Sequence, residues 1–109
     1  MKIALAQISS GTSVQQNIEK ISDFVQCAAE QNAELVVFPE ASMSAFGTDL
    51  LAAAEQAEHW QKTLASLAEE HHITIVVGEF EVAEERIRNL AAIYSPDGAR
   101  ASYTKIHLY

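Results

Sequence analysis

The sequence predicts an α/β fold in which βαβ units are followed by a β-hairpin. Short apolar and β-branched runs at residues 2–9, 34–38 and 73–78 alternate with two longer segments of helical periodicity. Strand, helix and strand in this length predict a right-handed βαβ unit with parallel strands. The turn sequence Pro96-Asp97-Gly98 then separates two extended segments and predicts an antiparallel hairpin.

The first helix is expected to begin directly after the first strand. Thr12 and Ser13 each have a glutamine three residues later, which is the pattern of a capping box. Apolar residues then recur at helical spacing from Val14 to Ala29. The helix is therefore expected to end near Asn32.

The second strand is expected to end at a proline. Residues 35–38 form a continuous apolar run, which is typical of a strand covered on both faces. Pro39 fixes its own φ and disfavours helical geometry in Phe38, so the strand should stop there. Glu40 is therefore expected at the carboxyl end of a strand, the edge at which open α/β sheets bind ligands.

A second helix and a hairpin should follow. Thr48 and Asp49 can cap an alanine-rich helix that runs to His71 or His72. Its expected inner stripe consists of Trp60, Leu64, Leu67, Ala68 and His71. After the third strand, residues 81–86 are expected to form a charged connection, and residues 87–95 and 100–109 to pair.

Composition limits the classes of function. A chain of 109 residues that is 49% hydrophobic and 20% charged predicts one folded globular domain. The net charge is −8, and segment 48–85 holds nine of the fifteen acidic residues with Lys62 as its one basic residue. Nucleic acid is not an expected partner, because phosphate binding needs a basic surface. No run approaches the roughly 18 apolar residues of a membrane span, so no membrane association is expected.

Cysteine and histidine predict neither a disulfide nor a metal site. Cys27 is the single cysteine, and the first residues lack the apolar core of a signal peptide, so a cytoplasmic location is expected. Cys27 lies among apolar helix residues and is expected to be a small buried side chain, not a nucleophile. His71 and His72 are adjacent on a helix and point in different directions, so no metal or other cofactor is expected.

Two ionisable residues stand at the ends of expected strands. Glu40 follows Phe38-Pro39, and Lys105 lies in the final extended segment. Taken alone, Glu40 could equally be an exposed loop carboxylate. Lys105 taken alone is better explained as an edge-strand lysine that discourages aggregation.

The order and spacing of these segments resemble the nitrilase superfamily of carbon–nitrogen hydrolases. The resemblance covers the whole chain and is carried by the opening strand Lys2-Ile3-Ala4-Leu5-Ala6-Gln7, by Ala33-Glu34-Leu35, Phe38-Pro39-Glu40 and Val77-Gly78, by Asn89, and by Tyr103-Thr104-Lys105-Ile106-His107-Leu108. It implies a four-layer α-β-β-α sandwich of which residues 1–109 form one incomplete domain, the amino-terminal portion. It also implies that the parent protein is a homo-oligomer.

The resemblance further implies a Glu-Lys-Cys triad that cleaves a small amide or nitrile. Glu40 would be the general base and Lys105 the group that stabilises the oxyanion, while the nucleophilic cysteine would lie downstream of these 109 residues. A carboxylate can deprotonate a thiol, and a fixed ammonium stabilises a developing negative oxygen. The chain alone is therefore expected to be inactive. Two alternatives are a small α/β domain that binds a ligand or partner without catalysis, and a fragment that completes a site with another polypeptide.

Overall fold

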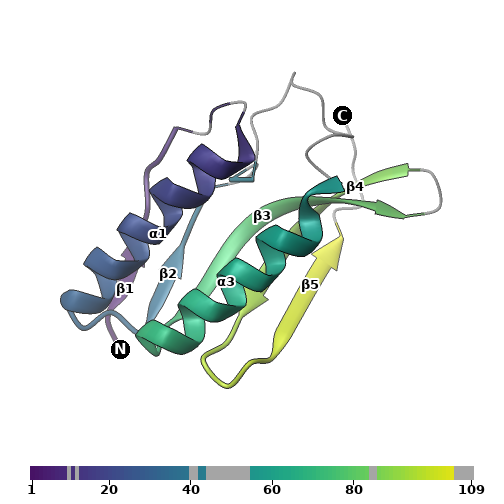
Figure 1. Cartoon of the computed structure of the whole chain (residues 1–109). Helices are drawn as coiled ribbons and strands as arrows, with labels where there is room; N and C mark the ends of the chain where they lie inside the picture. The colour runs from purple at the N-terminus through teal and green to yellow at the C-terminus, as the bar shows by residue number, and fades with distance from the viewer. Residues whose placement is uncertain (10, 12, 40–41, 44–54, 84–85, 105–109) are drawn as a thin grey trace.

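The computed structural model describes residues 1–9, 11, 13–39, 42–43, 55–83 and 86–104. In chain order these residues form β1 (Ile3–Leu5), α1 (Val14–Glu30), β2 (Leu35–Val37), α3 (Ala57–His71), β3 (Thr74–Ala83), β4 (Arg86–Tyr94) and β5 (Arg100–Thr104). Figure 1 shows the strands side by side in one sheet, with α1 and α3 packed across it.

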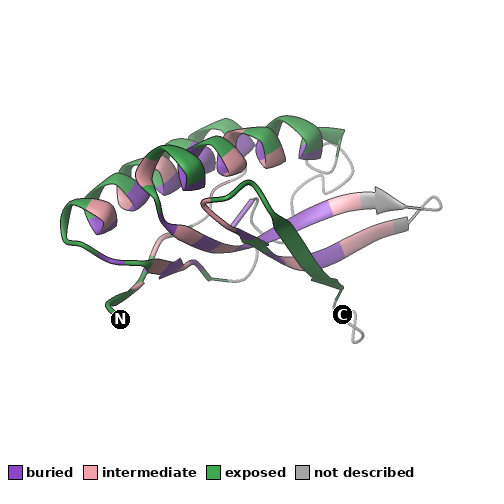
Figure 2. Cartoon of the chain, turned by 90° about the horizontal axis from the view of Figure 1, so that it is seen from below, coloured by how far each residue is buried: buried purple, intermediate pink, exposed green. Residues whose placement is uncertain are grey.

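The sheet is mixed and follows the order of the chain. Its strand order is β1-β2-β3-β4-β5, with parallel pairing from β1 to β3 and antiparallel pairing from β3 to β5. Both helices cover the same face of the sheet (Figure 2). The predicted α/β class, with βαβ units followed by a hairpin, is confirmed.

Helix α1 begins at one of the two residues that its capping pattern predicts, and the other, Thr12, lies outside the described part of the chain. Ser13 is the N-cap, and its Oγ accepts a hydrogen bond from the Gln16 backbone N–H at 3.2 Å. At the other end, Asn32 adopts a positive φ of 65°, and the Ala33 N–H donates to the Ala28 carbonyl at 3.0 Å. This closing pattern satisfies carbonyls that would otherwise lack partners at the helix end. Helix α3 ends in the same way, with His72 at a φ of 52°.

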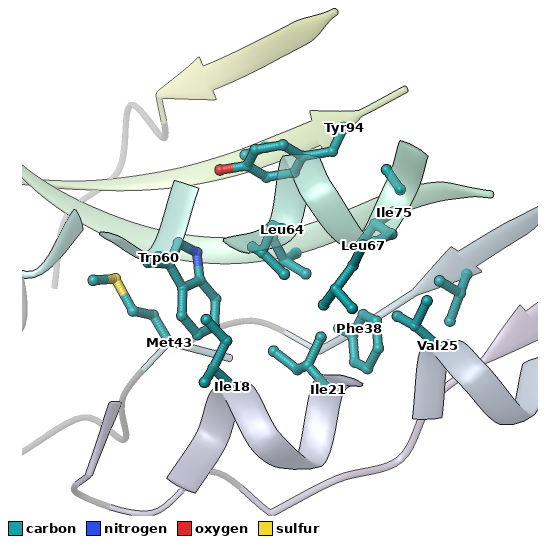
Figure 3. Close-up of a cluster of buried hydrophobic side chains, with 14 of the residues drawn as sticks. Ile18, Ile21, Val25, Phe38, Met43, Trp60, Leu64, Leu67, Ile75 and Tyr94 are labelled. Carbon is teal, nitrogen blue, oxygen red and sulfur yellow. The ribbon is translucent and has the colours of Figure 1, made fainter. Parts of the chain in front are cut away.

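The core lies between the two helices and the sheet. Trp60, Leu64, Leu67 and Ala68 of the predicted stripe on α3 are buried, whereas His71 is half-buried at the helix end. Figure 3 shows side chains of α1, of α3 and of the strands meeting in this cluster. Its fully buried members include Ile21, Val25, Val36, Trp60, Leu64 and Ile75.

Strand β3 is longer than the sequence predicts. We expected it to end at Gly78 and to be followed by a charged connection, but it runs to Ala83 and pairs with β4 throughout, from Ile75 opposite Tyr94 to Ala83 opposite Arg86. The interstrand hydrogen bonds of a hairpin satisfy the backbone whatever the side chains are, so charged residues need not end a strand. The prediction of a connection over residues 81–86 was wrong. Residues 105–109 of the last predicted segment lie outside the described part of the chain.

The face of the sheet without helices carries exposed apolar side chains. Ile3 is 52% exposed, Leu5 74%, Ile93 42% and Tyr103 63%. Register places them on one face, because Leu5 is level with Val37, Val76 and Ile93, and Tyr103 is opposite Ala91, two residues from Ile93. Among the helices described, none is long and apolar enough to cross a membrane.

The turn between β4 and β5 depends on a glycine. The Gly98 N–H donates to the Ser95 carbonyl at 3.1 Å, and Gly98 has a φ of 93°. A side chain is strained in this conformation, so Gly98→Ala should lower the free energy of unfolding by about 1 kcal/mol in urea titrations. Gly11→Ala is the matched control, because a Cβ there would meet Asn17 Oδ1 at an ordinary 3.8 Å. Equal stability of the two variants would contradict the requirement for glycine at Gly98.

Candidate active site

The two residues predicted to carry chemistry lie next to the described part of the chain. Glu40 and Lys105 are outside it, and the structure describes the residues that precede them, Pro39 and Thr104. The candidate site is therefore described by the strand ends next to these two positions and by the contacts that hold the neighbouring loops.

The strands that lead to Glu40 and Lys105 run in the same direction. β5 is antiparallel to β4, which is antiparallel to β3, and β3 is parallel to β2. The carboxyl ends of β2 and β5 consequently face one edge of the sheet (Figure 1). Val37 is level with Val76, Ile93 and Ala101, so Thr104 lies three residues further toward that edge. Three interstrand spacings separate the two strands, or about 14 Å in a flat sheet.

The chain on both sides of Glu40 is anchored. The Phe38 N–H donates to the Val76 carbonyl at 2.8 Å, and the Ser42 hydroxyl donates to the Pro39 carbonyl. Met43 is fully buried, and its Sδ accepts a hydrogen bond from the Phe80 N–H at 3.4 Å. Ser42 is fully buried as well.

Asn17 connects two loops at this edge. It is fully buried on α1, and its Nδ2 donates to the Gly11 carbonyl at 3.0 Å and to the Met43 carbonyl at 2.9 Å. Its Oδ1 accepts from the Gly11 N–H at 2.8 Å. The role of Asn17 was not predicted from the sequence, although an asparagine between Val14 and Ile18 on an apolar helix stripe indicates a buried polar residue.

Glu79 is the centre of a buried polar cluster on the helix side of the sheet. Its carboxylate is fully buried and accepts hydrogen bonds from Trp60 Nε1 at 3.0 Å, from the Tyr94 hydroxyl at 2.7 Å and from Gln61 Nε2 at 3.4 Å. The Arg100 guanidinium also donates to it and forms an ion pair. Burial, together with the negative charge of Glu79, raises the pKa of the Tyr94 hydroxyl above its usual value. The cluster links α3, β3, β4 and β5.

Cys27 is exposed, so the prediction of a buried side chain was wrong. It lies outside the stripe of α1 that contains Val25 and Ala28, and it is close to the helix end that leads into the start of β2. The carboxyl end of α1 leads into the amino end of β2, which lies at the opposite edge of the sheet from the carboxyl ends of β2 and β5 (Figure 1). His71 and His72 end α3, as expected, and within the residues searched no group of His, Cys, Asp and Glu could hold a metal ion.

Comparison with known proteins decides the family. The family model described as carbon–nitrogen hydrolase matches residues 2–109. The chain belongs to the carbon–nitrogen hydrolases, in the nitrilase superfamily. A hydrolase of Mycobacterium tuberculosis is 39% identical to this carbon–nitrogen hydrolase chain over 114 residues. An omega-amidase of Homo sapiens is 31% identical over an alignment of 113 positions that covers 99% of the chain.

Solved structures of carbon–nitrogen hydrolases have the same fold. An amidase from Nesterenkonia sp. superimposes with a TM-score of 0.88 and 29% identity over 100% of this chain. A variant of that amidase has been solved in complex with butyramide, and another with acrylamide added to its active-site cysteine. The chain spans 41% of the length of the two curated relatives and 44% of the Nesterenkonia amidase.

Proposed function

We propose that this chain is the amino-terminal part of an amidase that hydrolyses a small, non-peptide amide through a Glu-Lys-Cys triad. The observation that carries the proposal is the family match over residues 2–109, combined with the shared sheet edge at which β2 and β5 end. Relatives named as amidases, and the amidase that binds butyramide, favour an amide over a nitrile as substrate.

In the proposed mechanism, Glu40 and Lys105 each have one role. Glu40 takes the proton of a cysteine thiol, which then attacks the amide carbonyl carbon. Lys105 stabilises the negative oxygen of the tetrahedral intermediate. When that intermediate collapses, the C–N bond breaks, the nitrogen takes the proton held by Glu40 and leaves as ammonia, and water then hydrolyses the remaining thioester. The cysteine belongs to the part of the protein beyond these residues.

Residues 1–109 are proposed to be an incomplete domain. The chain spans 41% of its curated relatives, and one face of its sheet exposes Ile3, Leu5, Ile93 and Tyr103. Exposed apolar patches of this kind mark surfaces that another element covers. We propose that the second sheet of the sandwich covers this face.

We also propose a cytoplasmic location. The free thiol of Cys27 on the surface is compatible with a reducing cytoplasm.

The test is an assay of ammonia release from butyramide, a dicarboxylic acid monoamide and a small nitrile. The full-length gene product should release ammonia from at least one amide, and the purified chain of residues 1–109 should release none. If residues 1–109 show turnover and Glu40→Ala abolishes it, the proposal that the nucleophilic thiol lies outside these residues is contradicted. A stop codon directly after Tyr109 would favour the alternative of a non-catalytic binding or interaction domain.

A further inference from the structure

We propose that Asn17 is a positioning residue for the reaction, because its carboxamide fixes the loop that carries Glu40. This inference rests on the proposed role of Glu40 as the base. The hydrogen bonds described for the Asn17 side chain go to the backbone of Gly11 and Met43. Its effect would pass through the backbone of the segment after β2.

Both the nitrogen and the oxygen of the Asn17 carboxamide form hydrogen bonds with loop backbone. Both of its hydrogen bonds from Nδ2 go to main-chain carbonyls, those of Gly11 and Met43, and its Oδ1 binds the Gly11 N–H. The residue is fully buried, so water does not compete for these groups. Since α1 is packed against the sheet by its whole apolar stripe, Asn17 gives both loops a rigid reference point.

Met43 is the far anchor of the segment that contains Glu40. Its carbonyl is held by Asn17 and its side chain is fully buried, with Sδ bonded to the Phe80 N–H. On the near side, Phe38 is bound to β3, and the Ser42 hydroxyl closes a turn onto the Pro39 carbonyl. The backbone is therefore fixed both before and after Glu40, and Asn17 supplies the contact that comes from a different layer of the fold.

The side chain at position 17 must be an amide, because it has to donate as well as accept hydrogen bonds. An aspartate has nearly the same shape and could still accept from the Gly11 N–H, but its oxygens would oppose the carbonyls of Gly11 and Met43. Asn17→Asp would therefore release the Met43 anchor without creating a cavity. A displacement of about 1 Å at a catalytic group can cost about 10²-fold in rate.

The experiment is a double-mutant cycle of Asn17→Asp with Glu40→Gln in the full-length gene product. All proteins carry Cys27→Ser, which removes the exposed thiol from the background. Two rates are measured for each variant: kcat for an amide per titrated active-site thiol, and the second-order rate of acrylamide addition to that thiol. Titration corrects for any unfolded fraction.

Asn17→Asp is expected to lower kcat by about 10²-fold with KM changed less than about 2-fold. In the Glu40→Gln background, the same substitution should lower the acrylamide rate by less than about 3-fold, because residues that act as one unit give non-additive losses. Ser42→Ala removes the bond to the Pro39 carbonyl and is the milder second variant, with the same expected coupling to Glu40.

Val25→Ala is the control for stability alone, since Val25 is fully buried two turns along α1 and contributes no hydrogen bond to the loops. It should lower thermal stability and leave kcat per titrated thiol unchanged. Two results would overturn the positioning role and leave the role of Glu40 intact. One is a rate loss in the double variant that equals the product of the losses in the Asn17 and Glu40 single variants. The other is an unchanged kcat in Asn17→Asp. Normal turnover by Glu40→Gln would instead overturn the base assignment, and the positioning role with it.

Discussion

Glu40→Gln in the full-length gene product is expected to reduce kcat for an amide by about 10²- to 10⁴-fold, the range of general-base catalysis. Glutamine keeps the size of the side chain but cannot accept the thiol proton. Lys105→Ala should reduce kcat by about 10²- to 10³-fold, because the oxyanion would lose a charged partner. Steady-state ammonia release measures both effects, and KM should change much less than kcat.

Charged residues away from the candidate site provide matched controls. Glu34 is an exposed carboxylate immediately before β2, whereas Glu40 follows the same strand in the sequence. Lys62 is an exposed lysine on α3. Glu34→Gln and Lys62→Ala should retain full activity. Normal turnover by Glu40→Gln or Lys105→Ala would refute the role given to that residue.

Glu79→Ala is expected to lower the free energy of unfolding by about 3–5 kcal/mol, the range for breaking a buried ion pair by removing one partner. The carboxylate is fully buried, whereas the Arg100 side chain is 28% exposed, so water can solvate part of the abandoned guanidinium and the lower end of the range applies. The indole N–H of Trp60 and the hydroxyl of Tyr94 would lose their acceptor as well. Urea titration followed by tryptophan fluorescence measures the change, because Trp60 is the one tryptophan of the chain.

An isosteric variant separates charge from packing at this site. Glu79→Gln keeps the volume and one acceptor oxygen, so it should cost less than Glu79→Ala. Glu69 is an exposed acid on α3, and Glu69→Ala should stay within about 0.5 kcal/mol of the parent. A loss below about 1 kcal/mol for Glu79→Ala would show that the cluster does not stabilise the fold.

Much of the candidate site follows from local sequence. Pro39 predicts where β2 ends, and the alternation of strands and helices predicts that β2 is parallel to its neighbours. The distance between the ends of β2 and β5 needs the observed order of all five strands, because an antiparallel hairpin can be added to a sheet on either side. The assignment of Glu40 and Lys105 to one reaction comes from the family resemblance, since their positions at strand ends are compatible with exposed loop and edge residues.

The anchors of the site were beyond prediction from sequence. Asn17 bonds to Met43, 26 residues later, and Glu79 bonds to Arg100, 21 residues later. Whether a polar residue is buried depends on whether the fold brings it a partner, and these partners are distant in the chain. For the same reason, apolar character around Cys27 did not reveal its exposure, which depends on the face of α1 that the sheet covers.

The sequence by itself determined the elements whose causes lie within a few residues: the N-cap of α1 at Ser13, the end of β2 at Val37 just before Phe38-Pro39, the buried stripe of α3 and the turn at Gly98. Capping, fixed φ angles and helical periodicity act over single turns, so they can be recognised without the fold. The tertiary structure alone decided how far β3 extends, which face of the sheet stays exposed, and where Asn17 and Glu79 find partners. Those outcomes depend on contacts between segments that are distant in the chain. Such contacts stabilise the fold only once the segments have been brought together, so local sequence does not reveal them.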